Sequence, residues 1–139
     1  MSNDRYKYRV AVKQGTEWRI YDVLNILYKL DGTIWVRVIR QTETATFAAW
    51  LQVDGENAIL EQCTGLADKN GKLIYAGDVL EFYIKTRPVY VQWYSDNCCF
   101  VLQRFDIEGW EIRLIRDTAS RYSIIGNIHE MEVTKCNLK

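Results

Sequence analysis

Apolar and polar residues alternate with a period of two along most of this chain. In the segment YKYRVAV, residues 6–12, the even-numbered side chains are aromatic or aliphatic, while Lys7 and Arg9 occupy the odd positions. Successive side chains of a β-strand point to opposite faces, so this period is typical of a strand with one face buried. The pattern predicts a half-buried strand near the N-terminus.

The same alternation predicts strands along the rest of the chain. Asp31-Gly32 separates two of them, at 25–30 and 33–40, and this dipeptide accepts positive φ at both positions of a tight hairpin turn. Glu17–Tyr28 also carries apolar residues at helical spacing; a strand is favoured there and a helix is left open. Further strands are expected at 47–53, 58–63, 79–84, 89–94, 98–105, 110–115 and 123–129. The expected fold class is mainly β.

The stretch TGLADKNGKLIYAGDVLEF, Thr64–Phe82, contains two strong turn signals. An Asn-Gly pair at 70–71 and a Gly-Asp pair at 77–78 enclose a short bridging strand at 72–75. Glycine enters left-handed backbone conformations without a side-chain clash, which suits both corners. We therefore expect the main role of this stretch to be structural, and a functional role to be secondary.

Composition narrows the class of protein. The chain has 139 residues, of which 48% are hydrophobic and 26% charged, and 18 basic residues balance 18 acidic ones. These values predict one globular domain over residues 1–139. The order of the expected strands divides it loosely into an N-terminal sheet at about 1–62 and a barrel-like half at about 63–139. Neither a signal peptide nor a membrane-spanning stretch is evident, so a cytoplasmic location without membrane partners is expected.

Residue types that commonly support catalysis or metal binding are sparse. His129 is the only histidine, and we interpret it as a polar residue that packs at the end of a strand and not as a general base. The four cysteines lack the paired spacing of a zinc site and are interpreted as buried apolar residues, with one reactive thiolate left open: Cys63, Cys98, Cys99 and Cys136. We therefore expect no cofactor, no metal and no catalytic residue.

Asp68 and Asp78 form the remaining candidate for acid–base chemistry. The two turns that contain them would bring them to one rim, and hydrolases often use a pair of carboxylates. Aspartate also accepts backbone amide hydrogens in turns, which explains both residues without catalysis. The turn interpretation is favoured, and an enzyme with an unrecognised site is the least favoured class.

Binding is better supported, because five Trp and nine Tyr are many for a core of this size. In the strand expected at 33–40, Trp35, Arg37 and Ile39 share one face. An aromatic beside a guanidinium is typical of platforms for single-stranded nucleic acid. The same face also suits packing on a second sheet, with the Arg37 guanidinium reaching outward to solvent.

The motif at 64–82 resembles the signature of the YopX family of phage and prophage proteins. That signature has Thr-Gly-Leu, Asp-Lys-Asn-Gly, Ile-Tyr and Gly-Asp in this order and spacing. The C-terminal IIGNIHE, residues 124–130, is similar to the family's closing segment, with His129 in place of a tyrosine, and Val91–Trp93 resembles the strand that follows the signature. The resemblance covers the C-terminal half well and the N-terminal half more loosely.

The resemblance implies a compact, mostly β fold of several coiled antiparallel sheets, with an SH3-like barrel element in the C-terminal half and an origin in a phage or prophage. It implies no specific activity.

From these observations we expect a non-enzymatic module that binds a host or phage protein and can form homo-oligomers. The alternative is an SH3-like or OB-like module that binds nucleic acid. The expected contact residues are Asp68, Lys69, Asn70, Lys72 and Tyr75, with Trp35 and Arg37 for the alternative, and the expected structural turn residues are Gly65, Gly71, Gly77, Asp78 and Gly126.

Overall fold

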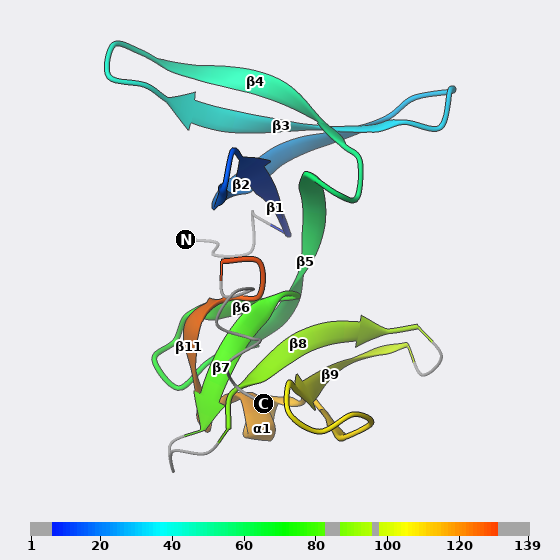
Figure 1. The fold of residues 1–139 in the computed structure, drawn as a ribbon, viewed down its shortest axis with the longest axis vertical. Helices are drawn as coiled ribbons and strands as arrows, with labels where there is room; N and C mark the ends of the chain where they lie inside the picture. The colour runs from blue at the N-terminus through cyan, green and yellow to red at the C-terminus, as the bar shows by residue number, and fades with distance from the viewer. Residues whose placement is uncertain (1–6, 83–86, 96–97, 131–139) are drawn as a thin grey trace. The chain divides into compact units, whose positions relative to one another are not determined.

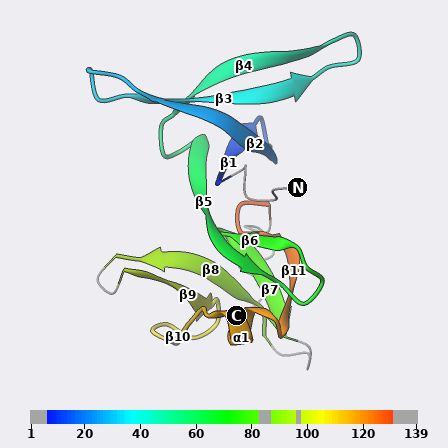
Figure 2. The ribbon, with the colours of Figure 1, turned by 180° about the vertical axis from the view of Figure 1, so that it is seen from behind.

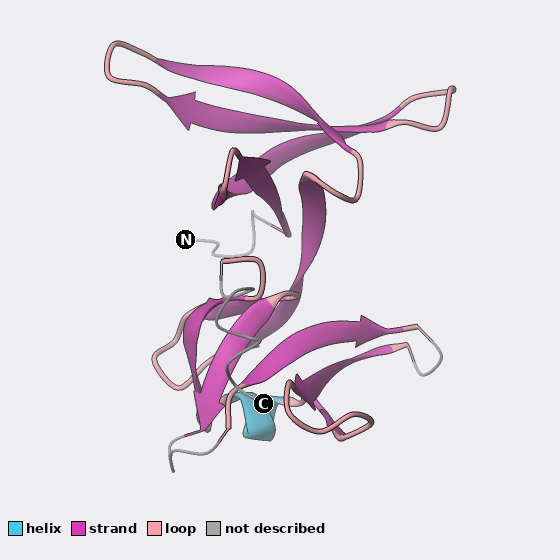
Figure 3. Ribbon diagram, viewed as in Figure 1, coloured by secondary structure: helices cyan, strands magenta, loops and turns pink. Residues whose placement is uncertain are grey.

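The computed structural model describes residues 7–82, 87–95 and 98–130. The chain divides into two compact units, Met1–Gln62 and Cys63–Lys139. Strands dominate both units, as Figure 3 shows, so the mainly β fold class is confirmed.

The first unit is an antiparallel sheet with the strand order β4-β3-β2-β1-β5 (Figure 1). Its strands are β1 (Tyr8–Gln14), β2 (Glu17–Tyr28), β3 (Ile34–Gln41), β4 (Thr46–Val53) and the beginning of β5 (Ala58–Ala67), which continues into the second unit. β2 covers the whole of the segment whose type the sequence left open, so the favoured strand is confirmed.

Alternation along these strands builds the core of the first unit. Val36 and Val38 of β3 are fully buried, and Val10 of β1 packs into the same cluster. Val23 and Ala58 complete the buried set, with partly buried apolar side chains around it. The apolar half of each strand therefore faces this cluster, as the period of two predicts.

The β2–β3 hairpin differs from the predicted two-residue turn. The N–H of Gly32 donates to the carbonyl of Lys29, and the N–H of Lys29 donates to the carbonyl of Thr33, both at 3.0 Å. Only Gly32 has positive φ, at 89°. The prediction of positive φ at both Asp31 and Gly32 was wrong, because the loop is a β-turn followed by one left-handed residue, the usual form of a longer hairpin.

The second unit contains an antiparallel sheet with the order β10-β9-β8-β7-β11 (Figure 2). Its elements are β7 (Asp78–Phe82), β8 (Val89–Tyr94), β9 (Cys99–Arg104), β10 (Glu111–Arg113), α1 (Arg116–Ala119) and β11 (Tyr122–Asn127), while β6 (Leu73–Tyr75) pairs with the end of β5. The coiled antiparallel sheets are confirmed, but the expected barrel is an open sheet, since β10 and β11 form its two edges among the described residues.

The core of the second unit lies on one side of this sheet. Ile74, Leu80 and Leu102 are fully buried at its centre. The rest of the buried cluster comes from β8, α1 and their neighbours: Val89, Val91, Leu114, Ala119 and Tyr122. The short helix therefore contributes Ala119 to a core that is otherwise made by strands and loops.

The turn at 68–72 is organised by one buried carboxylate. Asp68 is only 5% exposed. Its Oδ1 accepts the backbone N–H groups of Asn70 and Lys72, both at 2.9 Å, and its Oδ2 accepts the N–H of Ile124 in β11 at 3.0 Å. Gly71 takes the left-handed position, with φ 82°. Asp68 therefore shapes the turn and also ties it to a strand 56 residues further along the chain.

The second predicted corner is confirmed as well. Gly77 has φ 92°, and Asp78 Oδ2 accepts the N–H of Tyr75 at 2.8 Å across the turn between β6 and β7. Gly65 and Gly126 differ from expectation: Gly65 lies inside β5, where the register with β6 shifts, and Gly126 lies inside β11 beside a register shift. The prediction of turns was wrong for these two, because they mark irregularities within strands.

We expect Asp68→Ala to lower the free energy of unfolding by about 1–3 kcal/mol, because three backbone amides lose a buried acceptor. Urea unfolding followed by circular dichroism measures the loss. Asp54→Ala is the matched control, since Asp54 Oδ1 also accepts three backbone amides, at 2.8–3.0 Å, but on the exposed surface where water replaces it. An equal or larger loss for Asp54→Ala would contradict the role assigned to Asp68.

Candidate functional site

The face of β3 that points away from the core carries an aromatic residue, a cation and an aliphatic residue. Trp35, Arg37 and Ile39 alternate with the buried Val36 and Val38. Arg37 and Ile39 are exposed and Trp35 is half-buried. The structure therefore brings Trp35 and Arg37 together on an open face, and no second sheet of the described residues covers Arg37 and Ile39.

Neighbouring strands extend this face. The register places Leu27 of β2 beside Trp35, and Trp50 of β4 beside Arg37. Leu27 is 44% exposed and Trp50 is 45% exposed. Since Trp50 also lies diagonal to Trp35 across the β3–β4 pair, the two indoles are within the distance at which large side chains interact.

Two tryptophans, one leucine and one lysine enclose a shallow hollow on this face. Its volume is about 260 Å³, and its lining is Leu27, Lys29, Trp35 and Trp50. Drug-sized ligands occupy pockets of roughly 300–1,000 Å³, so this hollow suits a single large side chain of a partner better than a cofactor. We call the surface formed by these four residues together with Arg37 and Ile39 the aromatic face.

Trp35 is held in place by its hairpin. Its indole Nε1–H donates to Thr33 Oγ1 at 3.1 Å, and that hydroxyl donates to Asp31 Oδ1 at 2.6 Å. Lys29 Nζ lies 4.8 Å from the centre of the Trp35 ring, within the range of a cation–π interaction. The β2–β3 loop therefore fixes the orientation of the ring at the edge of the hollow.

The charge of Asp31 supports this arrangement. The hydrogen bond from the Thr33 hydroxyl, together with the Thr33 backbone N–H at 2.9 Å, holds the pKa of Asp31 below its ordinary value. A carboxyl group whose pKa is lowered on folding stabilises the folded state above its unfolded pKa and loses this contribution as the pH falls through its folded pKa. The anchoring of Trp35 is thus complete at neutral pH.

The residues expected at the contact rim lie in the second unit and fall into two groups. Lys69, Asn70 and Lys72 are exposed at the turn. Asp68 and Tyr75 are buried, so their side chains support the turn from inside. The exposed part of the rim therefore consists of two lysines and one asparagine.

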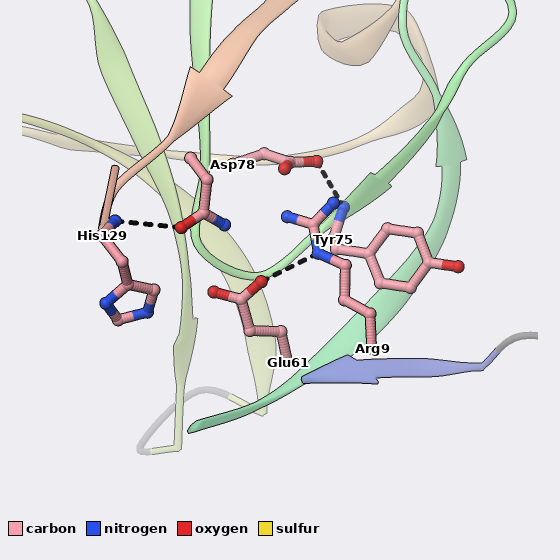
Figure 4. Close-up of polar contacts among 6 residues, drawn as sticks. Arg9, Glu61, Tyr75, Asp78 and His129 are labelled. Atoms are coloured by element: carbon pink, nitrogen blue, oxygen red, sulfur yellow. Dashed lines mark hydrogen bonds and ion pairs between the residues drawn. The ribbon is translucent and has the colours of Figure 1, made fainter. Parts of the chain in front are cut away.

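Backbone amides engage the two aspartates considered as an acid pair. Figure 4 shows Asp78 accepting the N–H of Tyr75, and Asp68 accepts three amides as described above. In the same figure the N–H of His129 donates to Asn127 Oδ1 at 2.9 Å. These contacts are those of turn and strand-end residues, which is the interpretation favoured from the sequence.

A buried ion pair joins two strands of the first unit. Arg9 of β1 and Glu61 of β5 face each other in the antiparallel register. Their Nε and Oε1 atoms are 2.8 Å apart, and the two side chains are 12% and 3% exposed (Figure 4). Such a pair fixes geometry more than it adds stability, because removing both charges from water costs much of what their attraction returns.

A second cleft, of about 230 Å³, lies in the second unit. Its lining includes Phe82, Arg87, Arg104, Trp110 and Tyr122. Asp106 already binds Arg104 through two hydrogen bonds of 2.8 and 2.6 Å, which raise the pKa of the guanidinium and lower that of the carboxyl. With this carboxylate beside the arginine, the cleft is a weaker candidate for a ligand than the aromatic face.

Sequence reasoning identified Trp35 and Arg37 but missed the residues that complete the aromatic face. Leu27, Lys29 and Trp50 come from two other strands and a loop. The hairpin between β3 and β4 is centred at residues 43–44, and this centre pairs Arg37 with Trp50. A predicted turn at 43–44 would therefore have placed Trp50 beside Arg37.

The described residues contain no grouping of three or more His, Cys, Asp or Glu side chains that would hold a metal ion. Three cysteines are free thiols, namely Cys63, Cys98 and Cys99, and Cys136 lies outside the described residues. Within the described part of the chain, no helix combines the length and apolar character needed to span a membrane.

These features define a small, mainly β protein with an open aromatic surface. The chain belongs to the YopX protein family, whose model matches residues 7–132. This confirms the resemblance seen in the motif at 64–82 and extends it through the N-terminal half. No curated protein sequence matches this chain.

A similar fold occurs in the crystal structure of protein EF1440 from Enterococcus faecalis. The two chains share 21% sequence identity with a TM-score of 0.60, over 93% of this chain and 96% of that chain. Identity at this level supports a common fold and carries no residue role from one protein to the other.

We expect Thr33→Val to raise the pKa of Asp31 toward its ordinary value, because the hydroxyl that stabilises the carboxylate is lost. The carboxyl carbon of Asp31, followed by NMR as the pH is lowered, reports the change. Thr33→Ser keeps the hydroxyl and should leave the pKa low. A pKa unchanged in Thr33→Val would contradict the proposed chain of contacts from Trp35 to Asp31.

Proposed function

We propose that this chain is a non-enzymatic accessory protein of phage or prophage origin that acts in the bacterial cytoplasm by binding another protein. The observation that carries the proposal is the aromatic face. It exposes large apolar side chains around a hollow with one cation, Lys29, on its border. Tryptophan and arginine are enriched where proteins bind one another, and this face presents both.

The composition of the face favours a protein partner over catalysis. Its polar atoms are few, and the Trp35 indole N–H is already bonded to Thr33. A hollow of this size accepts one apolar side chain of a partner, in the manner of an anchor residue filling a pocket. Lys29 at its border, and Arg37 opposite Trp50 on the same face, favour a partner segment with acidic residues next to that anchor.

The experiment compares proteins retained from a bacterial lysate by the tagged wild-type chain and by two matched variants. Leu27→Asp places a charge in the hollow, whereas Ile125→Asp makes the same change in β11 of the second unit, where Ile125 is 43% exposed. We expect Leu27→Asp to lose the partner that both wild type and Ile125→Asp retain, because an apolar anchor entering the hollow would have to remove a carboxylate from water.

The same assay distinguishes the aromatic face from the lysine rim. Charge reversal at Lys69 and Lys72 should leave retention unchanged if the aromatic face is the binding surface. Retention that is lost on charge reversal but kept in Leu27→Asp would move the site to the rim and contradict the proposal.

Single-stranded nucleic acid is a second candidate ligand, because the aromatic face combines two indoles with Lys29 and Arg37. Bases stack on aromatic rings, and the two cations would meet phosphates. The net charge of zero weakens the electrostatic attraction that supplies most of such affinity, so this candidate ranks second.

Fluorescence anisotropy of a labelled oligothymidine tests the second candidate. If it is correct, binding weakens as salt increases, and both Trp35→Ala and Arg37→Ala reduce the affinity. At about 1–3 kcal/mol per stacked base, Trp35→Ala lowers it by about 5-fold to 150-fold. Absence of binding at low salt would exclude this ligand.

A further inference from the structure

The free edge of β4 lacks the protection usual for an exposed strand. β4 is the last strand of the sheet in the first unit, and no described strand pairs with its outer side. Its sequence, TFAAWLQV, has eight residues with no charge and no proline, and its register with β3 runs without a bulge. Soluble proteins commonly protect edges with charges, prolines, bulges or short strands, so this edge is open to pairing.

The hairpins show which backbone groups of β4 point outward. Hydrogen-bonded pairs alternate along an antiparallel ladder. The β3–β4 hairpin closes with the N–H of Thr42 donating to the carbonyl of Ala45 at 2.7 Å, so Arg40 and Phe47 form the next bonded pair. Alternation from that pair leaves these residues with outward N–H and carbonyl groups: Thr46, Ala48, Trp50 and Gln52.

We propose that this edge pairs antiparallel with β4 of a second copy of the chain, about a two-fold axis at Ala49. In this register all four outward-facing residues of each copy pair with outward-facing residues of the other. Thr46 meets Gln52, and Ala48 meets Trp50. The two sheets would then continue as one, through a self-complementary interface of the kind that a two-fold axis requires.

Side chains are complementary in this register on both faces. On the aromatic face, Trp50 of each copy lies opposite Ala48 of the other, so a large ring meets a small side chain. On the core side, Phe47, which is 46% exposed, lies opposite Leu51 of the second copy. The nearest acidic residue, Asp54, would face Thr44, so no like charges meet along the strand.

Area and charge define the strength of this pairing. Fully covered aromatic side chains bury about 150–250 Å² each, so covering the exposed parts of Phe47 and Trp50 removes up to about 140–230 Å² per copy. Standard stable interfaces bury about 800 Å² per partner. Backbone pairing along the strand adds to the area buried by Phe47 and Trp50 but does not bring the total to that of a standard stable interface. We therefore expect a weak dimer whose population depends on concentration. The zero net charge of the chain offers no long-range repulsion against it.

Among possible occupants of the edge, a second copy fits best. The edge carries no charge to select an acidic or basic strand from elsewhere, and its own sequence provides the complementary side chains. The inference does not rest on the proposed function, because the pairing uses the outer backbone edge of β4 and needs neither Leu27 nor Lys29.

Sedimentation velocity over a range of concentrations tests the proposal. We expect wild type to shift from monomer toward twice the mass as concentration rises. Ala48→Pro removes an outward N–H that β3 does not use, a position at which an edge strand tolerates proline, and should remain monomeric. Ala48→Ser keeps the N–H and should dimerise as wild type does. Ala48→Lys is a second blocking variant that leaves the backbone intact.

Amide hydrogen exchange tests the register. Protection at Ala48 and Trp50 should rise with concentration in wild type, while the inward amide of Ala49 is protected at every concentration. A wild-type chain that stays monomeric, or an Ala48→Pro variant that dimerises as strongly as wild type, overturns the proposal. Protection that appears only when a different protein is added assigns the edge to that partner and also overturns it.

Discussion

The constraint behind most of this structure is that an antiparallel strand presents a different set of side chains on each face. In β3 the buried Val36 and Val38 build the core of the first unit, and this forces Trp35, Arg37 and Ile39 onto the opposite face. Neither a helix nor a second sheet among the described residues of that unit covers this face. The aromatic face and the core are therefore two results of one alternating pattern.

The motif that identifies the family is mainly structural. Asp68, Gly71, Gly77 and Asp78 shape two corners and tie one of them to β11. The aromatic face comes from residues 27–50, outside that motif. Membership in the YopX family covers both units, since the family model matches residues 7–132, but the motif itself says nothing about the exposed side chains of the first unit.

Local patterns predicted nearly every strand, because each depends only on alternation over several residues and on turn residues at its ends. The predictions failed where the outcome depends on distant partners. Asp68 and Tyr75 looked like surface residues of a polar turn, yet both are buried. Gly65 and Gly126 looked like turn residues, yet they lie inside strands, next to shifts in the pairing register. Leu27 and Trp50 join the site only through strand pairing, which alternation alone does not specify.

The ion pair between Arg9 and Glu61 affects the register in which β1 and β5 pair. A shift of β1 against β5 by two residues keeps the apolar side chains on the core side, so apolar burial alone discriminates weakly against it. The shift would place Arg9 opposite Ile59 or Cys63, leaving Glu61 without its cross-strand cation. Removing one partner of a buried ion pair costs about 3–5 kcal/mol. The pair therefore favours the observed register of β1 and β5 over one shifted by two residues.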